Sequence, residues 1–240
     1  MKSSPRLLLL HGLSANGGVW TDWEGVLERE HGGAWSAPDL PGHGAAARLR
    51  SYSFDSLASA VADNLQSGER VVVVGHSLGG VVGLALAGDG FGVDVRGVVA
   101  LGVKVDWTAD ELAKAQGLAA RPPTTFVSRE EAAARFVRVA GLEGLVDADH
   151  PAVTRGIAAD AGGWRLTADP ATIGVGAPDM RGLLAATRAP VVLVRGEHDP
   201  LQTTEQLREL DPASVELPGL GHYAQLEEPE TVWGLVRPLL

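Results

Sequence analysis

The chain has 240 residues, of which 45% are hydrophobic, and it carries a formal net charge of −10 at pH 7. This composition predicts a folded protein with a sizeable core, and the acidic excess with scattered basic residues argues against nucleic acids and anionic membrane surfaces as partners. Because the chain has no cysteine, disulfides, thiolate metal sites and cysteine nucleophiles are excluded.

Short apolar runs alternate with segments of helical spacing in the first half of the chain. The run of four leucines at 7–10 is too short for a signal-peptide core or a membrane span, so we expect a cytoplasmic protein. Ser53 precedes a segment in which apolar residues recur every fourth position, which predicts an N-cap and a helix. The expected elements are strands at 6–10, 34–38, 71–74 and 96–103, and helices at 19–30, after Ser53 and at 80–87.

The strand at 71–74 leads into a pentapeptide with a chemical signature. Its four consecutive valines are typical of a strand that is buried on both faces of a parallel sheet. Residues 75–79 then read Gly-His-Ser-Leu-Gly, which fits the G-x-S-x-G nucleophile elbow. In such a turn the serine takes a strained backbone conformation, and side chains two residues before or after it would collide with neighbouring elements. We therefore expect Ser77 to be a nucleophile above the sheet edge.

The pattern changes after residue 106. Thr108 and Ser128 each begin a sequence that is typical of a capping box, and each predicts the start of a helix. We find no strand pattern between 107 and 182 and expect a helical cap there. The predicted division is therefore a core domain at 1–106 and 183–240 with a cap (lid) insertion at 107–182.

The strand pattern resumes after the insertion. Strands alternating with helices predict a mostly parallel sheet with helices on both faces, which is an α/β fold. The expected elements are strands at 190–196 and 214–217 and helices at 204–210 and 230–239.

Two polar residues follow these last two strands and complete a candidate catalytic set. Asp199 comes just after the strand at 190–196, and His222 comes just after the strand at 214–217. Because ligands bind at the carboxyl ends of parallel strands, both side chains are expected near Ser77. The order serine, aspartate, histidine matches a nucleophile, an orienting acid and a general base. Asp106, which ends an earlier strand, is the alternative acid.

Five motifs in this order resemble the α/β-hydrolase superfamily over nearly the full length of the chain. The chain is most similar to the small capped serine hydrolases, a group of esterases, lactonases, C–C bond hydrolases and haloperoxidase-like enzymes. The matching motifs are LLLHG at 8–12, DLPGHG at 39–44, GHSLGG at 75–80, GEHDP at 196–200 and GH at 221–222.

The resemblance implies an active site between the sheet edge and the cap. It implies an oxyanion hole formed by the backbone N–H groups of Leu13 and Leu78. Few residues precede the first strand where the family usually has an extra hairpin, so we expect about six strands. Trp107 adjoins a strand end and is the expected substrate-binding residue; the alternative is a place in the cap core.

These observations predict a serine hydrolase that cleaves an ester-like bond of a small or medium substrate through a covalent acyl-enzyme. The reaction needs no cofactor, and no metal site is expected because His43 has no further ligands at suitable spacing. One alternative is a C–C bond hydrolase acting on a diketone or a ring-cleavage product. Another is a ligand-sensing protein on the same fold. The expected partner is a small molecule, and the expected assembly is a monomer or homodimer.

Overall fold

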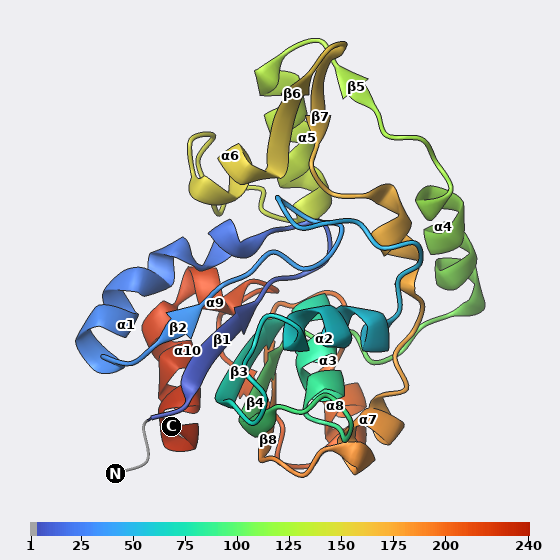
Figure 1. The fold of residues 1–240 in the computed structure, drawn as a ribbon. Coiled ribbons are helices and arrows are strands. Elements are labelled where there is room, and N and C mark those ends of the chain that lie inside the picture. Colours follow the sequence, from blue (N-terminus) through green and yellow to red (C-terminus); the bar gives the residue numbers. More distant parts are fainter. Residues whose placement is uncertain (1–3) are drawn as a thin grey trace.

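Six parallel strands form the central sheet of residues 4–240, which are the residues that the computed structural model describes (Figure 1). Every pair of neighbouring strands in this sheet is parallel, so their carboxyl ends lie at one edge. The expected fold class and strand number are therefore confirmed. In spatial order the strands are β2 (Trp35–Ser36), β1 (Arg6–Leu10), β3 (Arg70–His76), β4 (Asp94–Leu101), β8 (Val191–Gly196) and β9 (Val215–Leu217).

Alternating side chains of the central strands build two cores on opposite faces of the sheet. Leu7 and Leu9 pack in one core, whereas Leu8 and Leu10 pack in the other, and the valines of β3 alternate in the same way. The helices on the first face are α1 (Glu24–Glu30) and α10 (Pro229–Val236), and those on the second are α2 (Phe54–Ala62), α3 (Leu78–Leu86), α7 (Met180–Ala186) and α8 (Thr204–Leu210) (Figure 1).

Several helix starts follow the capping signals of the sequence. Ser53 and Thr108 each form a complete capping box, and the Ser128 side chain accepts a hydrogen bond from the Glu131 N–H. The helix expected at 19–30 is instead a 3₁₀ helix, η1 (Gly17–Trp23), followed by α1. The last helix is likewise split into α10 and η3 (Arg237–Leu239), since Pro238 has no N–H to continue the helical pattern. Within residues 4–240, no helix is long and apolar enough to cross a membrane.

The segment between β4 and β8 contains strands that the sequence did not indicate. β5, β7 and β6 form a three-stranded antiparallel sheet, so the expectation that this segment holds no strand is wrong. These strands have only two to four residues, which is too short to show a two-residue period. The inserted elements are α4 (Ala109–Ala119), β5 (Thr125–Phe126), α5 (Arg129–Ala140), α6 (Pro151–Gly156), β6 (Ile157–Asp160), β7 (Gly163–Leu166) and η2 (Pro170–Val175).

The insertion packs on the loops at the carboxyl edge of the sheet (Figure 1). Helix α6 contacts η1, and the Asn16 side chain donates a hydrogen bond to the Ala152 carbonyl at 2.8 Å. Phe136 of α5 and Val153 of α6 belong to the same apolar cluster as Trp20 of η1. The inserted elements therefore lie over the strand ends where the sequence predicts the reactive residues.

Candidate active site

Ser77 occupies a strained turn between β3 and α3. Its backbone has φ 49° and ψ −113°, a conformation that costs a non-glycine residue about 1–3 kcal/mol. A Cβ on Gly75 would overlap the Gly79 carbonyl oxygen, and a Cβ on Gly79 would overlap that of Leu10. Neighbouring backbone thus requires glycine at both positions and holds the serine where β3 ends.

Asp199 and His222 are joined by a hydrogen bond beside this turn. His222 Nδ1 donates to Asp199 Oδ2 at 2.9 Å, and the aspartate side chain is fully buried. The other carboxylate oxygen accepts the Leu201 N–H at 2.9 Å, which fixes the orientation of the carboxylate. With Nδ1 protonated in this bond, Nε2 of a neutral His222 is left as a proton acceptor.

Ser77 and His222 line one pocket of about 550 Å³, which we call the reaction pocket. Within the described part of the chain, no hydrogen bond joins the Ser77 hydroxyl to the histidine. Such contacts are often long without substrate and tighten when it binds. Asp106, the alternative acid, is exposed and accepts a hydrogen bond from Gln206 at 3.3 Å, whereas Asp199 is the carboxylate that contacts His222.

The loop that carries His222 is held by residues around it. His76 Nε2 donates to the His222 carbonyl at 3.0 Å, and the two imidazole rings lie 4.5 Å apart. Burial lowers the pKa of His76 well below its ordinary value, so its ring stays neutral and this hydrogen bond persists. On the other side a Cβ on Gly102, whose φ is 60°, would meet His222 Nδ1. The histidine ring is therefore packed against backbone and has little freedom to turn.

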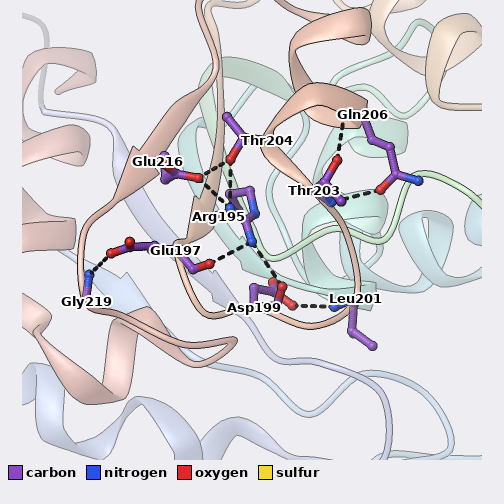
Figure 2. A network of polar contacts seen from close by, with 9 residues as sticks. All are labelled: Arg195, Glu197, Asp199, Leu201, Thr203, Thr204, Gln206, Glu216 and Gly219. Carbon is purple, nitrogen blue, oxygen red and sulfur yellow. Dashed lines mark hydrogen bonds and ion pairs between the residues drawn. The ribbon is translucent and has the colours of Figure 1, made fainter.

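Arg195 holds the loop that carries Asp199, and the sequence analysis missed it. Its side chain is only 7% exposed and forms an ion pair with Glu216 at 2.5 Å (Figure 2). Its second terminal nitrogen donates to the carbonyls of Glu197 at 3.0 Å and Asp199 at 3.1 Å. The sequence did contain a signal for this role, since Arg195 directly follows the apolar run 191–194. A charge at the end of a buried strand needs partners, so this residue could have been expected to bind neighbouring groups.

We expect Arg195→Met to lower kcat by about 10- to 100-fold with little change in KM, because it frees both loop carbonyls and misplaces Asp199. Arg195→Lys should recover only part of kcat, since one ammonium cannot make the planar set of contacts. Steady-state kinetics on a simple ester measure both variants, with Arg188→Met on an exposed ion pair as the control. An unchanged kcat in folded Arg195→Met would show that the loop keeps its position without the arginine.

Two backbone N–H groups beside Ser77 have no acceptor. Leu13 and Leu78 line a pocket together with Ser77, and among residues 4–240 neither N–H donates to another group. Leu78 begins α3, where the helix dipole favours negative charge. Unpaired donors on residues that line a pocket suit an oxyanion, and the oxyanion hole stays a prediction of the family resemblance.

Buried histidines fix the loop that carries Leu13. His43 Nε2 accepts the Ser14 N–H at 3.1 Å, and His11 Nε2 accepts the Leu40 N–H at 2.9 Å. Each ring donates its Nδ1 hydrogen to a carbonyl, that of Gly12 for His11 and that of Pro41 for His43. Both rings are therefore neutral. Burial lowers the pKa of His11 to about 3 and lowers the pKa of His43.

Stability should fall as the pH drops below about 6.5, the ordinary histidine pKa. His11, His43 and His76 have lowered pKa values when folded, so the unfolded chain binds more protons and acid favours unfolding. Protonation of each of these histidines in the unfolded chain lowers the free energy of unfolding by up to roughly 1.4 kcal/mol at pH 5.5. Urea unfolding between pH 8 and 5 measures this loss. A flat curve for the parent chain would contradict neutral buried rings.

Trp107 lines the reaction pocket and also a smaller, mostly apolar chamber beside Ser77. Its indole N–H donates to the Lys104 carbonyl at 3.3 Å, and Lys104 Nζ lies 4.8 Å from the ring centroid. Lys104 is in turn ion-paired with Glu111 of α4. The apolar chamber is lined by Phe54, Leu78, Val81, Leu112 and Val175, among others. In the part of the chain that the structure describes, no group of three or more His, Cys, Asp or Glu residues is arranged to hold a metal ion.

The family model described as "Alpha/beta hydrolase family" matches residues 7–234. The structure is similar to that of E-2-(acetamidomethylene)succinate hydrolase, with a TM-score of 0.78, 26% identity, and coverage of 99% of this chain and 92% of that one. It is also similar to an esterase of Mycobacterium tuberculosis, with a TM-score of 0.72, 25% identity, and coverage of 98% and 84%.

A curated relative, pimeloyl-[acyl-carrier protein] methyl ester esterase of Nitrosomonas europaea, is 38% identical over 91 residues, which are 35% of this chain. The aligned segment covers 32% of the length of that relative. The aligned segments of two further curated relatives cover 25% and 41% of the lengths of those proteins.

Proposed function

Because the chain belongs to the alpha/beta hydrolase family and is a hydrolase, we propose that it cleaves ester-like bonds with Ser77 as nucleophile, His222 as general base and Asp199 as orienting acid. The observation that carries this proposal is the Asp199–His222 hydrogen bond at 2.9 Å in a pocket shared with the strained Ser77. The core at 1–106 and 183–240, the cap at 107–182, the cytoplasmic location and a monomeric or homodimeric state stay predictions from the sequence.

In the proposed reaction His222 Nε2 accepts the Ser77 proton as the hydroxyl oxygen attacks the substrate carbonyl. The N–H groups of Leu13 and Leu78 stabilise the oxyanion of the tetrahedral intermediate; losing one such donor costs roughly 3 kcal/mol in comparable sites. The intermediate collapses as the C–O bond breaks, and the leaving alcohol takes the proton from His222. Water, deprotonated by the same histidine, then releases the acid and restores Ser77.

C–C bond hydrolysis uses the same residues and needs a group that binds a second carbonyl or carboxylate. Lys104 lines the reaction pocket and comes shortly after the end of β4, which makes it one candidate for such a group. Its ammonium is already paired with Glu111. This pairing leaves Lys104 unavailable as that group. Turnover of any ester would rule against the ligand-sensing alternative.

The test is p-nitrophenyl butyrate hydrolysis, followed both by nitrophenolate release and by the mass of the intact protein. We expect turnover with an initial burst, and a butyryl adduct that maps to the peptide containing Ser77 after rapid acid quenching. An adduct on another residue, or no turnover by the folded protein at pH 8, would overturn the proposal.

A further inference from the structure

A second chamber of about 160 Å³ adjoins the reaction pocket and lies beneath the inserted elements. The two cavities share the lining residues Leu118, Val139 and Ile173, so they lie next to each other. Ser14, which also lines the second chamber, follows Leu13 directly in the chain. This chamber, which we call the basic chamber, therefore borders the loop that carries the Leu13 N–H.

Two arginines line the basic chamber without a partner. Arg121 follows α4 and Arg135 lies on α5. Both residues are exposed, and among the described residues neither side chain takes part in a hydrogen bond or an ion pair. The acid of this lining, Asp169, is already engaged because it accepts hydrogen bonds from the Tyr52 hydroxyl at 2.9 Å and the Ala171 N–H at 3.1 Å. Two guanidinium groups thus lie at one cavity whose lining carboxylate, Asp169, forms its ion pair with a different cation, Arg48, at 3.8 Å.

The charge around both cavities has the opposite sign to the charge of the whole chain. Within a chain of net charge −10, the two linings contain five basic residues and only two acidic ones. Lys104 is paired with Glu111, and Arg138 lies 3.7 Å from Glu143, which leaves the two chamber arginines and Lys114 as the uncompensated charges. A local positive field in a cleft raises the concentration of anionic ligands there.

We propose that Arg121 and Arg135 form a subsite for an anionic group of the substrate, a carboxylate or a phosphate, in the chamber next to the reaction pocket. This inference rests on the proposed ester hydrolysis and names its substrate class, an ester with one anionic end and one apolar end. The planar guanidinium forks match the paired oxygens of either anion, and the apolar chamber beside Ser77 accommodates the other end.

Matched esters test which side of the bond carries the anion. On the acyl side, monoethyl adipate is compared with ethyl hexanoate, which replaces the carboxylate by a methyl group. On the alcohol side, 4-acetoxybenzoate and 4-acetoxyphenyl phosphate are compared with methyl 4-acetoxybenzoate, so that carboxylate and phosphate are distinguished. In at least one series we expect kcat/KM to favour the anionic ester about tenfold or more, through KM, with a preference that shrinks as salt is added.

The double variant Arg121→Gln/Arg135→Gln should remove this preference. Its matched control is Arg155→Gln/Arg181→Gln, which deletes two exposed arginines that line neither cavity and should keep the preference of the parent chain. Circular dichroism and melting temperature establish that each variant is folded.

Three outcomes would overturn the subsite while leaving ester hydrolysis intact. They are neutral esters cleaved without any anionic preference, a preference that survives Arg121→Gln/Arg135→Gln, and a preference lost equally in the control. No cleavage of any ester by the parent chain would instead overturn the proposed function itself.

Discussion

Ser77→Ala is expected to abolish ester hydrolysis, lowering kcat by a factor on the order of 10⁶, while the protein stays folded. Without the hydroxyl no acyl-enzyme forms, and only the oxyanion donors and substrate binding remain. Stability should change little because alanine is also an L-residue and must adopt the same φ of 49°. In the described chain the Ser77 side chain makes no hydrogen bond that the change would break.

Burst kinetics and a melting curve on the same sample measure this prediction. Ser128→Ala is the control, because it removes the N-cap of α5 and should cost about 1 kcal/mol of stability with no loss of turnover. Ser77→Ala should therefore lose activity and keep its stability, whereas Ser128→Ala should lose stability and keep its activity. A Ser77→Ala protein that still turns over substrate would disprove the assigned nucleophile.

Asp199→Asn is expected to lower kcat by about 10⁴-fold, whereas Asp106→Asn should change it less than about twofold. The Leu201 N–H requires an acceptor, so the asparagine would place its oxygen there and turn its NH₂ group toward His222. That NH₂ can only donate, which forces Nδ1 of the histidine to accept and leaves Nε2 protonated. The histidine would then be unable to take the Ser77 proton. Asp106 is exposed and contacts Gln206 instead.

Steady-state kinetics at pH 8 measure both variants on the same ester. Equal melting temperatures would show that any difference between them is chemical rather than structural. If Asp106→Asn were the slower enzyme, the orienting acid would have to be moved to the end of β4.

Local sequence signals predict a residue's structure and role correctly where its neighbours in the chain determine its environment. The valine run and the two glycines around Ser77 specify a buried strand and a tight turn, and the structure has both. Asp199 and His222 were placed near each other because parallel strands end at one edge, and the structure joins them by a hydrogen bond.

Local sequence signals do not predict the role of a residue that depends on segments distant in the chain. Arg195 contacts Glu216 of the adjacent strand β9, a pairing that exists only once the sheet has formed. The basic chamber brings Ser14 together with Arg121 and Arg135, which are more than a hundred residues away along the chain. The strands β5 to β7 depend on pairing with one another, since each is too short to be stable or recognisable alone.

The backbone conformation at Ser77 has a consequence for the stability of the protein. Glycine adopts a φ of 49° without the penalty that a serine carries, so selection for folding alone would favour glycine at this position. Ser77→Gly is therefore expected to relieve the backbone strain and to remove the proposed nucleophile in the same step. Serine at position 77 thus carries a stability cost that glycine would avoid, and one residue couples the stability of the chain to its proposed chemistry.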